Sequence, residues 1–217
     1  MINYTNMGFG IALSAFLICI TNLAFTLMDG HTKKPQNRVY ISIVLILAVN
    51  AINELINTST KELHMTSDTA FLTFRISQYV YFLTHTLLAP MFFLYISFII
   101  GRMVSGRISW KYKGTIPNFL LVAVPAVVIT ITEVVIALNP ITHWVWYYDE
   151  NRQFHRATGE FVFVYGVSAV WSISSFVLLM FSWKSLAKSR KYSIAVCFCL
   201  VAMGIITQLL TSNMRVE

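Results

Sequence analysis

Six long apolar blocks are the feature that most constrains how this 217-residue chain can fold. A helix that crosses a bilayer needs about 20 consecutive apolar residues, and an isolated strand would leave its backbone groups unpaired in lipid. The blocks therefore predict an all-α membrane protein, a six-helix transmembrane bundle within one transmembrane domain, residues 1–217. The predicted spans are 7–28, 39–57, 76–101, 115–138, 161–183 and 190–212.

The composition also indicates a membrane protein. Charged residues make up 12% of the chain and hydrophobic residues 57%, whereas a soluble domain carries about 25% charged residues. No basic residue precedes the first apolar run, and that run is long enough to span, so a cleaved signal peptide is not expected. Cys19, Cys197 and Cys199 all lie in apolar runs, which predicts no disulfide framework and no metal site. No cofactor is expected.

The distribution of basic residues predicts the orientation in the membrane. Eleven of the 16 lysines and arginines lie in the short connections 29–38, 102–114 and 184–189 or beside them, with Asp29 as the only acid among them. The positive-inside rule places these connections in the cytoplasm and the N-terminus outside. The net charge of +7 is then explained by topology and by the lipid bilayer, and no nucleic-acid partner is expected. The eleven are Lys33, Lys34, Arg38, Arg102, Arg107, Lys111, Lys113, Lys184, Lys188, Arg190 and Lys191.

Polar side chains in the outer halves of several spans predict a ligand site. In the second span they recur at i, i+3, i+4 and i+7, which is one helix face, and such a face is costly against lipid. We expect it to line a cavity open to the outside, with Glu54 and His85 as a buried pair. The alternative is hydrogen bonding between helices without any ligand, at about 0.6 kcal/mol for each bond. The candidate ligand-binding residues are Asn50, Glu54, Asn57, Tyr81, His85, Glu133, Tyr148 and Gln208.

The long connection 139–160 contains two aromatic runs around a polar centre. Residues 146–148 and 153–155 are predicted to form a β-hairpin, with residues 149–152 as the turn. Tryptophan and tyrosine are also typical of the membrane interface. The hairpin is therefore interpreted as a lid over the outer mouth of the bundle, and the alternative is an interfacial anchor with nothing beneath it.

The order of motifs around this connection resembles the N-terminal seven-span sensor region of bacterial histidine kinases, a region that also precedes GGDEF diguanylate cyclase domains. The resemblance rests on Asn139-Pro140, on the run 147–151, on the run 154–156, on the span opening at 161–165, and on HTLLAPMFFLYISFIIG in the third span. It covers most of the chain. It departs from the family pattern where Ala157 and Thr158 precede Gly159, and it lacks a seventh span, which favours a chain cut before that span and before an output domain.

The resemblance implies a sensor in the bacterial cytoplasmic membrane, not itself an enzyme, that detects an extracytoplasmic small ligand, peptide or membrane signal. It implies coupling to a histidine kinase or a diguanylate cyclase, and a homodimer if the output is a kinase. Two alternatives stay open at this point. A transporter is disfavoured because the two halves show no convincing repeat, and a membrane-embedded enzyme because HExxH, GxSxG and paired-carboxylate motifs are missing from the sequence.

Overall fold

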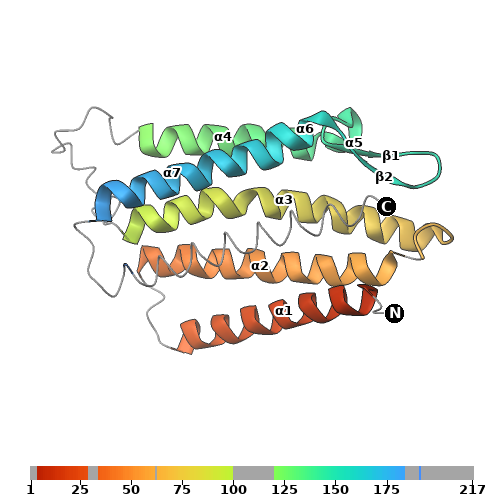
Figure 1. Cartoon of the computed structure of the whole chain (residues 1–217), viewed down its shortest axis with the longest axis horizontal. Helices are drawn as coiled ribbons and strands as arrows, with labels where there is room; N and C mark the ends of the chain where they lie inside the picture. The colour runs from red at the N-terminus through yellow and green to blue at the C-terminus, as the bar shows by residue number, and fades with distance from the viewer. Residues whose placement is uncertain (1–3, 29–33, 62, 100–119, 184–190, 192–217) are drawn as a thin grey trace. The chain divides into compact units, whose positions relative to one another are not determined.

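The computed structural model describes residues 4–28, 34–61, 63–99, 120–183 and 191. The chain divides into two compact units, Met1–Phe176 and Val177–Glu217, and the boundary falls inside the last described helix. The features discussed below belong to the first unit. Helices and one small hairpin account for its regular structure (Figure 1).

The elements follow one another as five long helices with short elements inserted before the last. The long helices are α1 (Tyr4–Met28), α2 (Pro35–Thr60), α3 (Asp68–Ile99), α4 (Leu120–Ala137) and α7 (Val167–Ser182). The short elements are α5 (Asn139–Thr142), β1 (Trp146–Tyr148), β2 (Phe154–Arg156), α6 (Thr158–Glu160) and the π-helix η2 (Phe161–Gly166). Helix α6, η2 and α7 follow one another without a break, so they form one continuous rod.

Within the described residues, four helical segments are long and apolar enough to cross a membrane, which indicates a multi-pass membrane protein. They are Gly8–Met28, Gln36–Thr60, Asp68–Ile99 and Thr158–Met180. The predicted span 115–138 corresponds to α4, whose described apolar stretch, Ala126–Ala137, is shorter than these four. The predicted span 190–212 lies outside the described residues, so the count of six spans stays a prediction.

Helix α3 begins earlier than the sequence pattern indicates. The predicted span starts at residue 76, but the helix starts at Asp68, and the predicted long connection 58–75 reduces to the few residues between α2 and α3. Charged residues such as Arg75 end the apolar window without ending the helix. The Ser67 hydroxyl accepts a hydrogen bond from Ala70 N (3.4 Å), and Asp68 places an acid in the first turn, where it favours helix. The 32 residues of α3 are about 48 Å long, against a bilayer core of about 30 Å.

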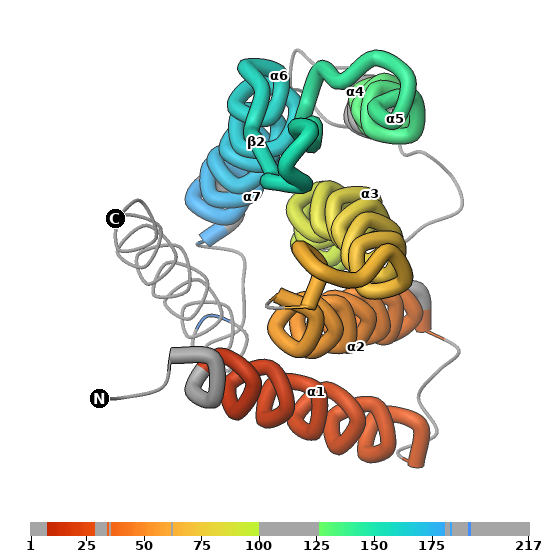
Figure 2. The backbone as a smooth tube through the Cα atoms, turned by 90° about the vertical axis from the view of Figure 1, so that its right-hand side faces the viewer, coloured from red at the N-terminus to blue at the C-terminus, as the bar shows by residue number. Residues whose placement is uncertain are grey.

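Neighbouring helices in the sequence are neighbours in space. Helix α1 packs on α2, α2 on α3, and α3 on α4. Figure 2, seen from the end that carries the hairpin, shows β2 beside α3. A cluster of buried apolar side chains lies at that end and joins α3, α4, the hairpin and η2. Its members are Phe82, Ile136, Val145, Trp146 and Val164.

Candidate functional site

The predicted β-hairpin is present, with a small shift of its second strand. Trp146 pairs with Arg156, Tyr147 with His155, and Tyr148 with Phe154, so the second strand is one residue later than expected. The turn is closed by hydrogen bonds from Arg152 N to Asp149 O (3.0 Å) and from Asp149 N to Gln153 O (3.1 Å). Arg152 adopts a left-handed φ of 64°, which is uncommon for a residue other than glycine.

Asn139 fixes the base of the hairpin to the end of α4. Its side chain is almost fully buried, at 1% exposure. Its Oδ1 accepts hydrogen bonds from Val145 N (2.7 Å) and Trp146 N (3.3 Å), and its Nδ2 donates to Trp146 O (3.0 Å). One amide thus satisfies three backbone groups that would otherwise be buried without partners, which explains why an asparagine stands at the turn out of α4.

Gly159 allows the chain to return closely past the base of the hairpin. Its N–H donates to Trp144 O (3.0 Å), beside a bond from Ala157 N to Val145 O (2.9 Å). A Cβ at position 159 would lie 2.4 Å from Trp144 O, far inside van der Waals contact. This position therefore requires glycine because of a close backbone approach, not because of an unusual φ.

Aromatic side chains of α3 pack beneath the hairpin, so the two share a core. Trp146 stacks on Phe82 of α3, with ring centroids 4.2 Å apart and an interplanar angle of 13°. Phe154 lies over the same Phe82 ring at 6.3 Å. Tyr148 meets Phe71 edge-on at 5.4 Å. The hairpin therefore covers one end of α3, and its role as a lid over a ligand cavity stays a prediction.

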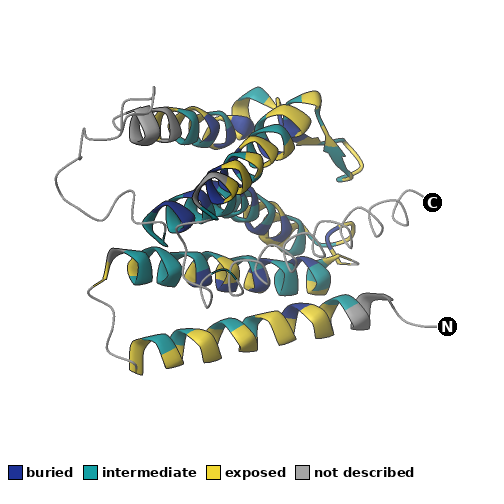
Figure 3. Ribbon diagram, turned by 60° about the vertical axis from the view of Figure 1, so that its left-hand side comes forward, coloured by how far each residue is buried: buried dark blue, intermediate teal, exposed yellow. Residues whose placement is uncertain are grey.

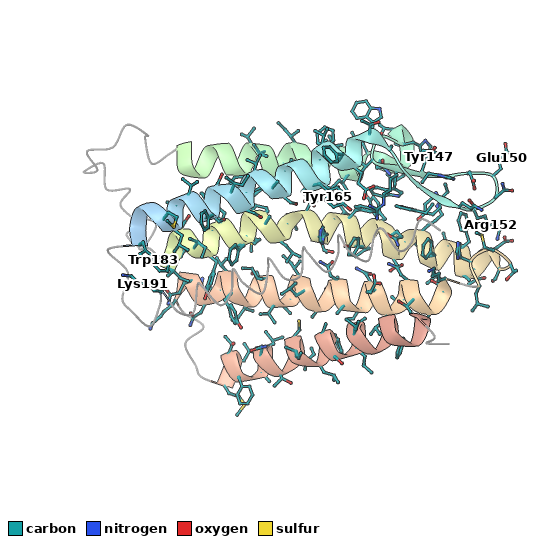
Figure 4. The ribbon with its side chains drawn as sticks, viewed as in Figure 1. Tyr147, Glu150, Arg152, Tyr165, Trp183 and Lys191 are labelled. Carbon is teal, nitrogen blue, oxygen red and sulfur yellow. The ribbon has the colours of Figure 1, made fainter. Side chains whose placement is uncertain are left out.

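Charged groups surround the hairpin at its rim (Figure 4). Arg152 at the tip forms an ion pair with Asp68 at the start of α3, and its guanidinium lies over the Phe71 ring at 5.2 Å. Asp149 accepts from Gln153 N (2.8 Å) and contacts His155 Nε2 (3.1 Å), and these hydrogen bonds lower the pKa of its carboxyl. Burial raises the pKa of Tyr148, an effect that the nearby Arg75 opposes.

The predicted polar face of α2 meets α3. Thr84 donates a hydrogen bond to Asn50 Oδ1, and Ser77 donates to Asn53 O (3.1 Å) or Oδ1 (3.3 Å). Asn57 is buried, and its Oδ1 has no hydrogen-bond partner, like the Nδ2 atoms of Asn50 and Asn53. This face therefore retains hydrogen-bonding capacity that the described residues leave unused.

The other predicted residues gather around α3 but on different sides of it. Glu133 of α4 accepts a hydrogen bond from Thr86 (2.7 Å), whereas His85 stacks on Tyr81 at 5.0 Å. Tyr81 interacts electrostatically with Glu54. Glu54 and His85 form no ion pair, so the predicted buried pair is not present among the described residues. Gln208 lies outside the described residues.

No family model, curated protein or solved structure matches this chain. What its site can bind must therefore come from its own geometry. Within the described parts of the chain, no three His, Cys, Asp or Glu side chains are placed to hold a metal ion.

The structure adds three residues that sequence reasoning missed: Arg156, Glu160 and Tyr165. Glu160 is buried, its Oε2 lies 3.6 Å from Arg156 Nε, and Arg156 Nη1 donates to the Tyr165 hydroxyl (3.1 Å). All three interact electrostatically with Tyr81. The Arg156–Glu160 spacing of four was visible in the sequence, but Tyr165 joins them because η2 is a π-helix. A π-helix bonds i to i+5, which brings Tyr165 onto the face of Glu160.

Proposed function

We propose that this chain is a membrane-embedded sensor module. It holds six spans of a seven-span sensor region with its N-terminus and hairpin outside, and it couples an extracytoplasmic ligand or membrane signal to a cytoplasmic histidine kinase or diguanylate cyclase. The resemblance to the sensor region of histidine kinases and the charge distribution support this role. So does a polar cluster under an outer lid.

The observation that carries the proposal is the way the hairpin is tied to several helices at once. Trp146 stacks on α3, Asn139 bonds the hairpin to the end of α4, and Gly159 bonds it to the start of the α6–η2–α7 rod. A ligand that displaces the hairpin therefore changes contacts on three membrane helices together. A sensor needs two helix arrangements that differ in ligand affinity, and this shared contact gives such a change a route across the membrane.

Cross-linking the hairpin to α3 tests the proposal. Asp68→Cys and Arg152→Cys, made together in the natural full-length protein, place two thiols where the native ion pair holds the side chains together. A short bis-maleimide reagent then restrains the hairpin. The output is measured as autophosphorylation or as cyclic dinucleotide synthesis. We expect the output of the cross-linked protein to stay constant when the extracytoplasmic medium is changed.

The single variants Asp68→Cys and Arg152→Cys, treated with the same reagent, are the matched controls, because they carry the modification without the bridge. They are expected to respond like the unmodified protein. A bridged protein that keeps the full range of response would contradict the sensor role of the hairpin.

Labelling from outside tests the orientation separately. Glu150→Cys at the hairpin tip should react with a membrane-impermeant maleimide in intact cells, and Ser105→Cys in the connection 102–114 only after permeabilisation. The reverse pattern would overturn the orientation.

A further inference from the structure

Glu160 is a buried carboxylate whose hydrogen bonding is incomplete. The residue is 3% exposed; the Tyr165 hydroxyl hydrogen-bonds its carboxyl group, but its Oε2 atom is left without a hydrogen-bond partner. The nearest cation is Arg156, whose Nε lies 3.6 Å from that oxygen, a distance that allows an ion pair but not a hydrogen bond. A buried charge is costly unless it is both paired and hydrogen-bonded, so Arg156 compensates Glu160 only in part.

Arg156 is held loosely at this position. Its side chain is 58% exposed, against 4% for that of Glu160. Its remaining hydrogen bond in the cluster runs from Nη1 to the Tyr165 hydroxyl (3.1 Å). Arg156 is exposed, donates to one uncharged hydroxyl and pairs with Glu160 without a hydrogen bond, so another cation can replace it.

The surroundings of Glu160 favour a positive charge. The charged groups that act on Tyr81 are two carboxyl groups, those of Glu54 and Glu160, and the Arg156 guanidinium. Tyr81 and Tyr165 add aromatic rings of the kind that attract organic cations.

We propose that Glu160 anchors a binding site for an organic cation, an amine or guanidinium group that exchanges with Arg156. The proposal rests on the sensor function and names the chemical class of its ligand. The incoming cation donates a charge-assisted hydrogen bond to Oε2, and Arg156 moves out to solvent. Arg156 is the last residue of β2 and Glu160 immediately precedes η2, so the exchange breaks a direct link between the hairpin and the rod that crosses the membrane.

Methylguanidinium chloride is the probe, because it carries the head group of Arg156 without the tether. The full chain, purified in detergent, is titrated with it, and the shift in unfolding temperature is compared with that in sodium chloride at equal ionic strength. We expect the unfolding temperature of the wild-type protein to rise with the methylguanidinium concentration and then to level off. In Arg156→Ala the competitor is missing, and the half-maximal concentration should fall about tenfold.

Glu160→Gln keeps the shape of the side chain and removes its charge, and it should abolish the saturable shift. Glu150→Gln, the same change at the exposed hairpin tip, should leave the wild-type titration unaltered. Tyr165→Phe removes the hydroxyl that contacts both Arg156 and Glu160, which frees Arg156 to leave, and should give a half-maximal concentration between those of the wild type and Arg156→Ala. This last variant keeps the test decisive if Glu160→Gln does not fold.

Three results would overturn the cation site: a saturable shift that persists in Glu160→Gln, a half-maximal concentration unchanged in Tyr165→Phe, or no saturable shift in Arg156→Ala. The exchange would also be overturned if the unfolding temperature of the wild-type protein did not change at a hundred times the concentration that saturates Arg156→Ala. Arg156 would then be a permanent partner of Glu160. The titration needs no cytoplasmic enzyme, so its failure leaves the sensor role standing. A failed cross-linking test would likewise leave the cation site standing.

Discussion

Helices α1 and α3 are both long and apolar, yet they use their polar side chains in opposite ways. In α1 the hydroxyls of Ser14, Thr21 and Thr26 all donate to backbone carbonyls four residues earlier in the same helix. In α3 the hydroxyls of Ser77 and Thr86 reach side chains on α2 and α4. A hydroxyl that bonds to its own helix does not orient a neighbouring helix, whereas a hydrogen bond between two helices fixes how they are rotated against each other.

Burial shows the same difference. Of the apolar window of α1, 6% is buried, against 33% for α3, and Figure 3 shows α1 largely in the colour of exposed residues. Phe25 of α1 is 68% exposed, while Phe82 of α3 is 4% exposed. An apolar sequence alone therefore does not tell whether a membrane helix carries the specific contacts of a fold. The polar groups and the aromatic partners on the helix decide that.

The largest difference in the free energy of unfolding is expected between matched glycine substitutions at the hairpin base and in α1. Gly159→Ala forces a Cβ to 2.4 Å from Trp144 O and should lower the free energy of unfolding by about 3 kcal/mol or more. Gly10→Ala in α1 meets nothing within 4 Å and should stabilise the protein by about 0.5 kcal/mol through helix propensity. Denaturation in detergent, followed by tryptophan fluorescence, measures both. Equal effects of the two changes would show that the hairpin base tolerates a side chain.

Removing an amide should give the next largest contrast. Asn139→Ala leaves the buried N–H groups of Val145 and Trp146 without an acceptor and should cost about 2–3 kcal/mol. Asn22→Ala in α1 removes a single exposed bond to Ile18 O and should cost within about 0.5 kcal/mol. The same denaturation measurement applies. If Asn139→Ala proved as mild as Asn22→Ala, water would have to replace the amide at the hairpin base.

A smaller difference in the free energy of unfolding is expected between matched threonine substitutions in α3 and α1. Thr86 has one hydroxyl proton, and its shortest bond is the 2.7 Å contact to Glu133, so Thr86→Val should cost about 1 kcal/mol. Thr21→Val in α1 breaks only a bond to its own helix and should be close to neutral. Thermal unfolding of the two variants side by side provides the measurement. A neutral Thr86→Val would mean that the α3–α4 bond does not stabilise the fold.

The smallest effect concerns pH. The pKa of Asp149 lies below its usual value of 3.8 in the folded hairpin, because Gln153 N and His155 bind its ionised form. A lowered folded pKa gives stability that is present above the unfolded pKa and is lost as the pH falls through the folded value. Hairpin fluorescence should therefore change below about pH 4, and Asp149→Asn should flatten this change while keeping the acceptor for Gln153. A change of equal size in Asp149→Asn would assign it to another group. Helix α1 contains no Asp, Glu, Lys, Arg or His, so it should add nothing to the pH dependence.

Much of this architecture could be predicted from the chain alone. The apolar blocks predicted the positions of the described long helices, and the two aromatic runs around the polar centre predicted the hairpin, with its second strand one residue too early. The start of α3 was predicted too late, because an apolar window ends where lipid ends, while a helix continues as long as its backbone bonds and first-turn groups allow.

The site was harder to predict for a geometric reason. Asn50, Glu54 and Tyr81 were predicted as site residues because they lie on polar faces of regular helices, and their role in binding stays a prediction. The sequence pattern could not place Glu133 on a different side of α3 from His85, because periodicity gives the face of one helix and not its rotation against the next. Tyr165 could not be joined to Arg156 and Glu160 from the sequence, because a π-helix changes the residue spacing that defines a face.

Hydrophobicity and local turn chemistry are properties of short segments, so the sequence by itself determined the membrane helices and the hairpin between α4 and the α6–η2–α7 rod. Which polar groups meet depends on how separate segments are rotated and how closely they approach. Only the tertiary structure therefore decided that Asn139 holds the hairpin, that Gly159 must lack a side chain, and that Glu160 lies buried near Arg156 with one oxygen that accepts no hydrogen bond.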